Sequence, residues 1–180
     1  MRDPDAKRQR LLEAGLAEFA EHGIAGARMD RIAKLAGCSA GLVYSYFENK
    51  EGLFEAVFVA IAERTVAEIA ITPHDLPEYA GRLFDSHEAH PEFVRLVTWH
   101  QLERSVRIPV VAEANCVKAN AIRSAQDDGL VANRFDAAEL LVMVFTLSAM
   151  WAAEPPAASA AVRAHRRATV VAAVRRLVEP

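Results

Sequence analysis

The sequence predicts an all-α protein, with an N-terminal three-helix unit that contains a helix-turn-helix and a long fourth helix leading into a C-terminal helical region. Apolar residues recur at helical spacing along most of the 180 residues. Glycine and proline fall between these stretches, where helices are expected to end. No segment alternates apolar and polar residues convincingly enough to indicate a strand. With 52% hydrophobic residues, the chain can bury a substantial core and is not disordered.

The first helix is expected over residues 4–21. Pro4 suits the first helical position, where the missing amide proton costs nothing. Gly23 is expected to end the helix. Its apolar positions recur at helical spacing and are Leu12, Leu16, Phe19 and Ala20.

Two short helices joined by a glycine turn follow over residues 28–46. Gly37 supplies the tight conformation that stops the first of them, and Ser39 can cap the second with its hydroxyl oxygen. Val43 is expected to close the packing between the two. The first presents an apolar face made of Ile32, Ala33, Leu35 and Ala36. This pattern is typical of a helix-turn-helix, whose second helix enters the DNA major groove, although two packed helices of any all-α protein would share it.

The stretch SAGLVYSYFENKEGL, residues 39–53, resembles the TetR family of one-component transcriptional repressors. The family's usual pattern is Ser-Lys-Gly-Thr-Leu-Tyr-x-x-Phe-x-x-Lys-Glu-x-Leu. The positions in register with it are Gly41, Tyr44, Phe47, Lys50, Glu51 and Leu53. Gly23, Ile32-Ala33 and Ala36-Gly37 also match, so the likeness covers about residues 5–60, within a family-type region of about 5–65.

The resemblance implies that the second short helix reads DNA and that its surroundings bind phosphate. Ala40 replaces a lysine common in the family, and Arg28 stands where Thr or Ser often caps a helix. The expected DNA-binding residues are Arg28, Ser39, Ala40, Gly41, Tyr44, Ser45, Tyr46 and Lys50. Tyr46 can instead pack in the core. Near the chain start, Lys7, Arg8 and Arg10 either reach phosphate or form a solvated helix end.

Whole-protein charge gives no general attraction to DNA, because the net charge is −3. Residues 1–50 carry eight Lys or Arg against seven Asp or Glu, and residues 51–180 carry thirteen against seventeen. A local basic edge must therefore hold the phosphates. The small side chains of the second short helix predict sparse base contacts, with thymine methyl groups and DNA shape carrying recognition.

A long helix is expected from Lys50 to about Ala70, and Thr72-Pro73 ends it. The short polar segment that reaches Pro77 is the best boundary between the N-terminal and C-terminal regions. We therefore assign residues 1–50 to a DNA-binding domain and residues 51–180 to an effector-binding and dimerisation domain.

Five further helices are expected in the C-terminal region. They extend over about residues 76–90, from Pro91 to the break at Arg107-Ile108-Pro109, from 110 to Gly129, over 136–153 and over 159–178. Asp136 can cap the fourth of these, with Glu139 as its capping-box partner. Residues 140–151 are almost continuously apolar but too few for a membrane span, so no membrane association is expected.

The last two helices carry more apolar surface than so small a domain covers alone. Pairing of the same two helices with those of a second copy would bury it in an isologous four-helix interface. The resemblance implies the same homodimer. Two recognition helices on a symmetric dimer imply a palindromic operator.

The resemblance also implies a pocket for a small-molecule effector in the C-terminal region. Aromatic or flexible apolar side chains with a few polar groups are typical of such a site. The candidates are Phe84, His87, Trp99, Glu103, Asn115, Met143, Leu147 and Trp151. The same residues also describe an ordinary core. Trp99 and Asn115 are the preferred ligand contacts.

The sequence contains no phosphate-binding glycine loop, nucleophile elbow or convincing acid–base pair, and it gives no reason to expect a cofactor. His87, His90, His100 and Glu103 could form a metal cluster, but solvent or core positions fit these histidines better. The polar N-terminus and the two cysteines, which show no disulfide or metal pattern, favour the cytoplasm. The prediction is a ligand-released repressor. The alternatives are an effector-independent architectural DNA-binding protein and a metal-dependent enzyme.

Overall fold

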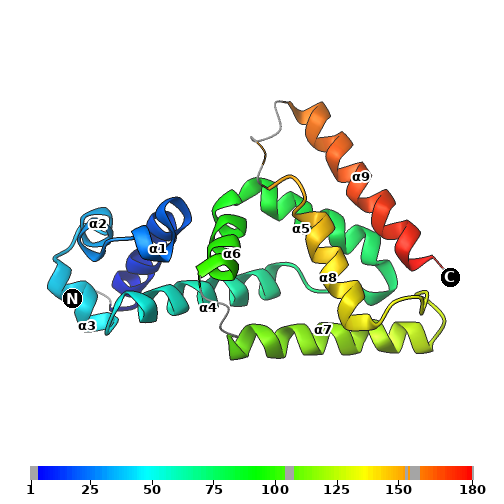
Figure 1. Ribbon diagram of the computed structural model, residues 1–180, viewed down its shortest axis with the longest axis horizontal. Helices are drawn as coiled ribbons and strands as arrows, with labels where there is room; N and C mark the ends of the chain where they lie inside the picture. The colour runs from blue at the N-terminus through cyan, green and yellow to red at the C-terminus, as the bar shows by residue number, and fades with distance from the viewer. Residues whose placement is uncertain (1–3, 104–107, 153, 155–158, 180) are drawn as a thin grey trace. The chain divides into compact units, whose positions relative to one another are not determined.

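The computed structural model describes residues 4–103, 108–152, 154 and 159–179, and these residues contain α-helices, one short 3-10 helix and no strand (Figure 1). The all-α prediction is therefore confirmed. The helices are α1 (Pro4–Gly26), α2 (Met29–Leu35), α3 (Ala40–Tyr46), α4 (Lys50–Glu68), η1 (Pro73–Asp75), α5 (Leu76–Ala89), α6 (Pro91–Glu103), α7 (Pro109–Asp127), α8 (Ala137–Ser148) and α9 (Ala160–Val178).

The chain divides into two compact units that alternate along the sequence. The first unit comprises Met1–Arg64 and Glu92–Ile108, and the second comprises Thr65–Pro91 and Pro109–Pro180. Helix α6 thus belongs to the same unit as the helix-turn-helix, although more than forty residues separate Tyr46 from Pro91.

Helix α1 extends beyond the expected end at residue 21. Gly23 breaks the regular dihedrals with φ 68° and ψ −177°, and a second, short helical stretch follows this kink to Gly26. The amide of Ala27 then donates to the Gly23 carbonyl over 3.2 Å. Gly23 therefore redirects the helix, in a conformation that residues with a side chain avoid.

The two short helices form as predicted, with one difference in their packing. Gly37 takes the left-handed φ of 66°, and the Ser39 hydroxyl accepts a hydrogen bond from the Leu42 amide over 3.3 Å. Ile32 is fully buried, but Leu35 is 61% exposed rather than part of the apolar face. The buried stripe of α2 is centred on Met29, Ile32 and Ala33, and Leu35 lies beyond its edge.

Helices α4 and α6 complete the core of the first unit. The Phe19 ring meets Phe54 edge-on with centroids 5.2 Å apart, which joins α1 to α4. The His100 ring of α6 lies 6.1 Å from Phe54 and 4.8 Å from Phe58, centroid to centroid. On α6, Trp99 also donates from its indole nitrogen to the Ala20 carbonyl over 3.3 Å.

The second unit is built around α5, which packs against α8 and α9 (Figure 1). Its buried core includes Tyr79 and Leu140, both 0% exposed. Arg167 of α9 reaches across to the carboxylates of Glu78 and Asp85 on α5. These bonds raise the pKa of Arg167, and the hydrogen bond that Arg167 donates to Asp85 is the largest cause.

Helix α8 begins as predicted and ends early. Asp136 caps it by accepting from the Ala138 amide over 2.8 Å. The helix stops at Ser148 and not near 153, and Ala149 leads into a turn in which the Ala152 amide donates to the Ala149 carbonyl. The turn accompanies edge-on packing of Trp151 against Phe84. The break expected at Arg107 and the stop expected at residues 153, 155 and 156 lie outside the described residues.

His87 closes the end of α5 against the end of α8. Its Nδ1 lies 3.1 Å from the Ser148 carbonyl oxygen. Burial lowers the pKa of His87 from its ordinary value of 6.5, and the hydrogen bond to Ser148 opposes this change. The ring is therefore mostly neutral at neutral pH.

None of the described helices is both long and apolar enough to cross a membrane.

Gly23→Ala is expected to lower the free energy of unfolding by at least about 2 kcal/mol, because the backbone conformation at Gly23 strains any L residue. An added Cβ would also lie 2.6 Å from Glu103 Oε1 and 2.9 Å from Trp99 Cε3. Chemical denaturation monitored by tryptophan fluorescence measures the loss. Gly41→Ala is the matched control, because a Cβ there meets nothing within 4 Å and its helical site gains from alanine. Equal stability of the two variants would contradict the assigned kink.

The lowered pKa of His87 predicts a loss of stability in mild acid. The unfolded chain binds the proton near pH 6.5 and the folded chain only at lower pH, so the free energy of unfolding falls as the pH drops below about 6.5. Denaturant titrations between pH 7.5 and 5 are expected to show a smaller fall for His87→Asn than for the parent. His74→Asn, at an exposed position, is expected to leave the slope unchanged.

Candidate nucleic-acid interface

Helix α3 buries one side and exposes the rest. Val43 is 0% exposed and anchors the helix, whereas Tyr44 is 53% exposed. Residues four apart lie on the same side of a helix, so Gly41 and Ser45 form the outward edge opposite to the anchored side. Both are exposed, and nothing lies within 4 Å of a Cβ added at Gly41. A surface of this kind can approach another molecule closely.

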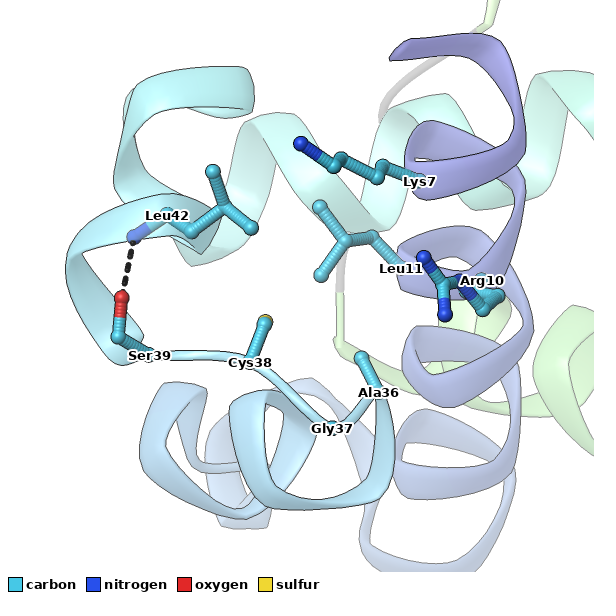
Figure 2. A pocket seen from close by; sticks show the side chains of 8 residues that line it. All are labelled: Lys7, Arg10, Leu11, Ala36, Gly37, Cys38, Ser39 and Leu42. Carbon is cyan, nitrogen blue, oxygen red and sulfur yellow. Dashed lines mark hydrogen bonds between the residues drawn. The ribbon is translucent and has the colours of Figure 1, made fainter. Parts of the chain in front are cut away.

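A hollow of about 450 Å³ lies on one side of α3, between it and the start of α1. In Figure 2, Lys7 extends from α1 toward α3, and the Ser39 hydroxyl faces the Leu42 amide. The hollow is lined by Lys7, Arg10, Leu11, Ala36, Gly37, Cys38, Ser39 and Leu42. Two cationic side chains thus border the turn of the helix-turn-helix.

A second hollow, of about 410 Å³, lies beside the residues Ala40 and Tyr44 of α3. Ala27, Arg28, Met29, Asp30 and Lys50 complete its lining. Four of the eight predicted DNA-binding residues therefore meet around one hollow. The outward edge of α3 is flanked by two hollows, each with two basic side chains.

Arg28 is paired with a neighbour. Its Nε and Nη2 donate to the two carboxylate oxygens of Asp30 over 3.0 and 2.9 Å. The bonds from Arg28 hold the pKa of Asp30 below its usual value. Both side chains are about 60% exposed, so the pair is open to exchange with an incoming anion.

Lys50, Tyr46 and Ser45 each make a bond within the unit. Lys50 Nζ donates to the carbonyls of Ala25 and Ala27 over 3.1 and 3.2 Å. The Tyr46 hydroxyl donates to the Pro4 carbonyl over 3.3 Å, and the Ser45 hydroxyl donates to Leu42. Lys50 thus combines a place in the second hollow with a structural role.

Two carboxylates, those of Glu18 and Glu103, hold the junction of α1 and α2 by hydrogen bonds. The sequence did not predict this role for either residue. Glu18, 3% exposed, accepts from the Arg28 amide over 2.9 Å and from Arg31 Nε over 2.6 Å. Glu103 Oε2 accepts from the Ile24 and Ala25 amides over 2.8 and 2.9 Å. No local sequence signal pairs Glu103 with residues about eighty positions earlier. The position of Lys7 and Arg10 beside the first hollow could be anticipated from the sequence, since i,i+3 spacing places both on one face of α1.

The expected effector residues are divided between the units. Trp99 and Glu103 belong to the first, where they bind the end of α1. The others lie in the second unit and are Phe84, His87, Asn115, Met143, Leu147 and Trp151. Phe84 is 1% exposed, and Leu147 and Trp151 pack against the same core. The eight residues do not form one cluster within either unit.

The possible metal cluster is divided in the same way, with His87 and His90 in the second unit and His100 and Glu103 in the first. Across the described part of the chain, no group of three or more His, Cys, Asp or Glu side chains is placed to hold a metal ion.

Two protein-family models match the chain. Residues 11–57 match the model described as "Bacterial regulatory proteins, tetR family". Residues 75–176 match "Tetracyclin repressor-like, C-terminal domain". The two matches cover the helix-turn-helix and most of the second unit.

Individual proteins with similar sequences or structures are also transcriptional regulators. The chain is 38% identical over 159 residues to the HTH-type transcriptional repressor SCO4008 of Streptomyces coelicolor, covering 86% of this chain and 82% of the repressor. A crystal structure of SCO4942 from Streptomyces coelicolor, described as a candidate transcriptional regulator, is 37% identical with a TM-score of 0.84 and covers 96% and 98% of the two chains. The regulator FadR of Bacillus subtilis, solved with stearoyl-CoA, shares the fold at 18% identity with a TM-score of 0.64, covering 92% of this chain and 96% of FadR.

Proposed function

The chain belongs to the TetR family of bacterial regulatory proteins, and from this premise we propose that it is a dimeric repressor that leaves its operator when a small molecule binds. TetR-family members are helix-turn-helix transcription factors and not enzymes. Sequence-specific DNA binding and transcriptional repression are therefore its function. The dimer, the DNA-contacting residues and the response to a small molecule belong to the proposal, as does its place in the cytoplasm, where chromosomal DNA lies.

The exposed edge of α3 between two basic hollows carries the proposal. In a major groove, a helix has one phosphate backbone on each side. Lys7 and Arg10 contact one backbone from the first hollow, with Ser39 beside them. Arg28 and Lys50 face the other backbone from the second hollow, and Tyr44 hydrogen-bonds a phosphate from the same side. Contacts of this kind fix the register of the helix in the groove without reading bases.

The bases themselves face small side chains. Ala40, Gly41 and Ser45 offer little hydrogen-bonding capacity, and this leaves apolar contact with thymine methyl groups and sequence-dependent DNA shape as the means of recognition. Tyr46 lies on the side of α3 nearest Pro4, where its hydroxyl is already bonded. Its contact with phosphate requires exchange of that bond.

Dimerisation through α8 and α9 presents this reading edge twice. Large apolar residues exposed on or beside these helices support the interface: Val142 is 61%, Met150 49% and Val162 39% exposed. Pairing with a second copy removes these surfaces from water. The recognition helices then contact half-sites one DNA turn, about 34–36 Å, or a multiple of it apart. The operator is a palindrome.

The second unit is proposed to bind the effector. Release of DNA requires that the effector bind more tightly to the form of the dimer whose reading helices are misaligned. The Bacillus subtilis FadR, solved with stearoyl-CoA, is a protein of this fold with a bound small molecule. An architectural DNA-binding protein without an effector is the remaining alternative, and a second unit that binds no small molecule would favour it.

Ala40→Lys is expected to raise affinity for the operator and to steepen its salt dependence. One added phosphate contact changes the slope of log K against log salt by about 0.9. Footprinting on DNA upstream of the protein's own gene first defines the site. Fluorescence anisotropy on that site from 50 to 300 mM KCl then gives the slope. Ala67→Lys, an equal charge change on an exposed part of α4, is expected to change the slope much less. An unchanged slope for Ala40→Lys would remove residue 40 from the interface.

Val142→Glu is expected to convert the dimer to monomer, because it places a charge in the centre of a buried apolar interface. Sedimentation velocity at about 10 µM protein reads the oligomeric state, and footprinting reads the accompanying loss of operator occupancy. Leu130→Glu is the control, since Leu130 is 58% exposed in the segment between α7 and α8. A parent protein that sediments as a monomer would refute the dimer outright.

A further inference from the structure

The two hollows beside α3 differ in charge. Among the described residues that line the first hollow, Lys7 and Arg10 are cationic and none is acidic. The lining of the second hollow includes the cations Arg28 and Lys50 and also the carboxylate of Asp30. The second hollow therefore offers less positive charge to a phosphate backbone than the first does.

Asp30 occupies the donors of Arg28 that suit a phosphate. Nε and Nη2 of Arg28 donate to the two carboxylate oxygens of Asp30 over 3.0 and 2.9 Å. A guanidinium group binds a phosphate in the same bidentate arrangement. While Arg28 is bound to Asp30, these two donors are therefore not free to contact DNA.

The pair between Arg28 and Asp30 lies in water. The side chains are 64% and 60% exposed, respectively. Ion pairs with this exposure add little to the stability of a fold. Because the pair also lines a hollow at the DNA-reading edge, its effect is expected in DNA binding rather than in folding.

We propose that Asp30 is a specificity-determining residue of the DNA interface. It retains Arg28 when phosphates are loosely placed, and it releases Arg28 only where the operator register brings a phosphate within reach of both donors. This inference rests on the DNA contacts proposed above, and it adds a residue that opposes binding to non-operator DNA.

The two kinds of DNA complex differ in how a phosphate competes with Asp30. Binding to non-operator DNA is essentially electrostatic, so cancelling the charge of Arg28 weakens it directly. Asp30 is tethered two residues from Arg28, and a phosphate that is not held in register competes poorly with a tethered partner. In the operator complex, base and shape contacts hold the phosphate in place, and the exchange replaces one charged acceptor by another. A group that weakens the wrong complex more than the right one raises specificity.

Lys50, the other cation of the second hollow, is held in a different way. Its Nζ donates to the carbonyl oxygens of Ala25 and Ala27. These acceptors are neutral, so they leave the positive charge of Lys50 uncancelled. Asp30 therefore acts on Arg28, and the test must separate these two residues.

Asp30→Asn in the full-length protein is the first test, by fluorescence anisotropy with the footprinted operator and with a random-sequence duplex of equal length. Affinity for the random duplex is expected to rise more than affinity for the operator. The ratio of the two affinities is expected to fall by about fivefold, as for one surface charge interaction at each of two half-sites. On the random duplex, the slope of log K against log salt is expected to steepen by up to about 0.9 for each added phosphate contact.

Asp128→Asn is the matched control, because it makes the same change of charge at an exposed position beyond α7. It is expected to leave both the affinity ratio and the salt slope unchanged. An unchanged ratio for Asp30→Asn, or an equal fall for Asp128→Asn, would overturn the proposal. A lowered Tm for Asp30→Asn with an unchanged ratio would assign Asp30 a structural role and would overturn it too.

A double-mutant cycle with Arg28→Met tests whether Asp30 acts through Arg28. The Arg28 amide, which donates to Glu18, is retained in this variant. In the Arg28→Met background, Asp30→Asn is expected to leave the affinity ratio unchanged, because no guanidinium remains to be released. The same fall in both backgrounds would overturn the proposal, since Asp30 would then repel DNA without involving Arg28.

The same measurements separate failure of this inference from failure of the proposed DNA interface. If Ala40→Lys and Arg28→Met both change operator affinity while Asp30→Asn leaves the ratio unchanged, the interface stands and the role of Asp30 falls. If Arg28→Met binds the operator and the random duplex as the parent does, the proposed contact of Arg28 falls and the inference falls with it.

Discussion

The first unit depends on the hydrogen bonds that charged side chains make to the backbone at the junction between α1 and α2. The backbone here changes direction at Gly23 and exposes amides and carbonyls that no helix satisfies. Glu103 accepts from two of the amides, and Lys50 donates to two of the carbonyls. Glu18 holds the Arg28 amide at the start of α2. Because α2 carries the turn and α3, these charged side chains determine where the reading edge points.

Local chemistry made much of the fold predictable. Ser39 and Asp136 cap the helices that they were expected to cap, and Gly37 takes the conformation that its turn needs. Each of these effects acts within four residues. Leu35 was misplaced because a seven-residue helix is too short for periodicity to define its buried side. The bond from Glu103 to Ile24 spans 79 positions, and no local pattern in a single sequence encodes such a pairing.

The DNA-reading edge and the effector site differ in how far the sequence indicated them. The outward edge of α3 could be predicted from the sequence, because Val43 anchors the helix and helical spacing then defines the opposite side. The two hollows beside this edge could be located only in the structure, because residues that line them, such as Lys7 and Tyr44, come from different helices. Aromatic and aliphatic residues at helical spacing describe a core and a pocket wall equally well. Trp99 was therefore expected at a ligand, whereas its indole bonds the end of α1.

The alternation of the two units along the chain has a consequence for biosynthesis. The first unit uses Glu92–Ile108, which follows a segment belonging to the second unit. A nascent chain that has reached only Arg64 lacks the ring of His100 on Phe54 and the carboxylate of Glu103 on Ile24. The first unit therefore cannot complete its fold while only its N-terminal segment has left the ribosome. It is finished only after α6 has been synthesised, so a ribosome-bound or prematurely terminated fragment carries the recognition motif without its support.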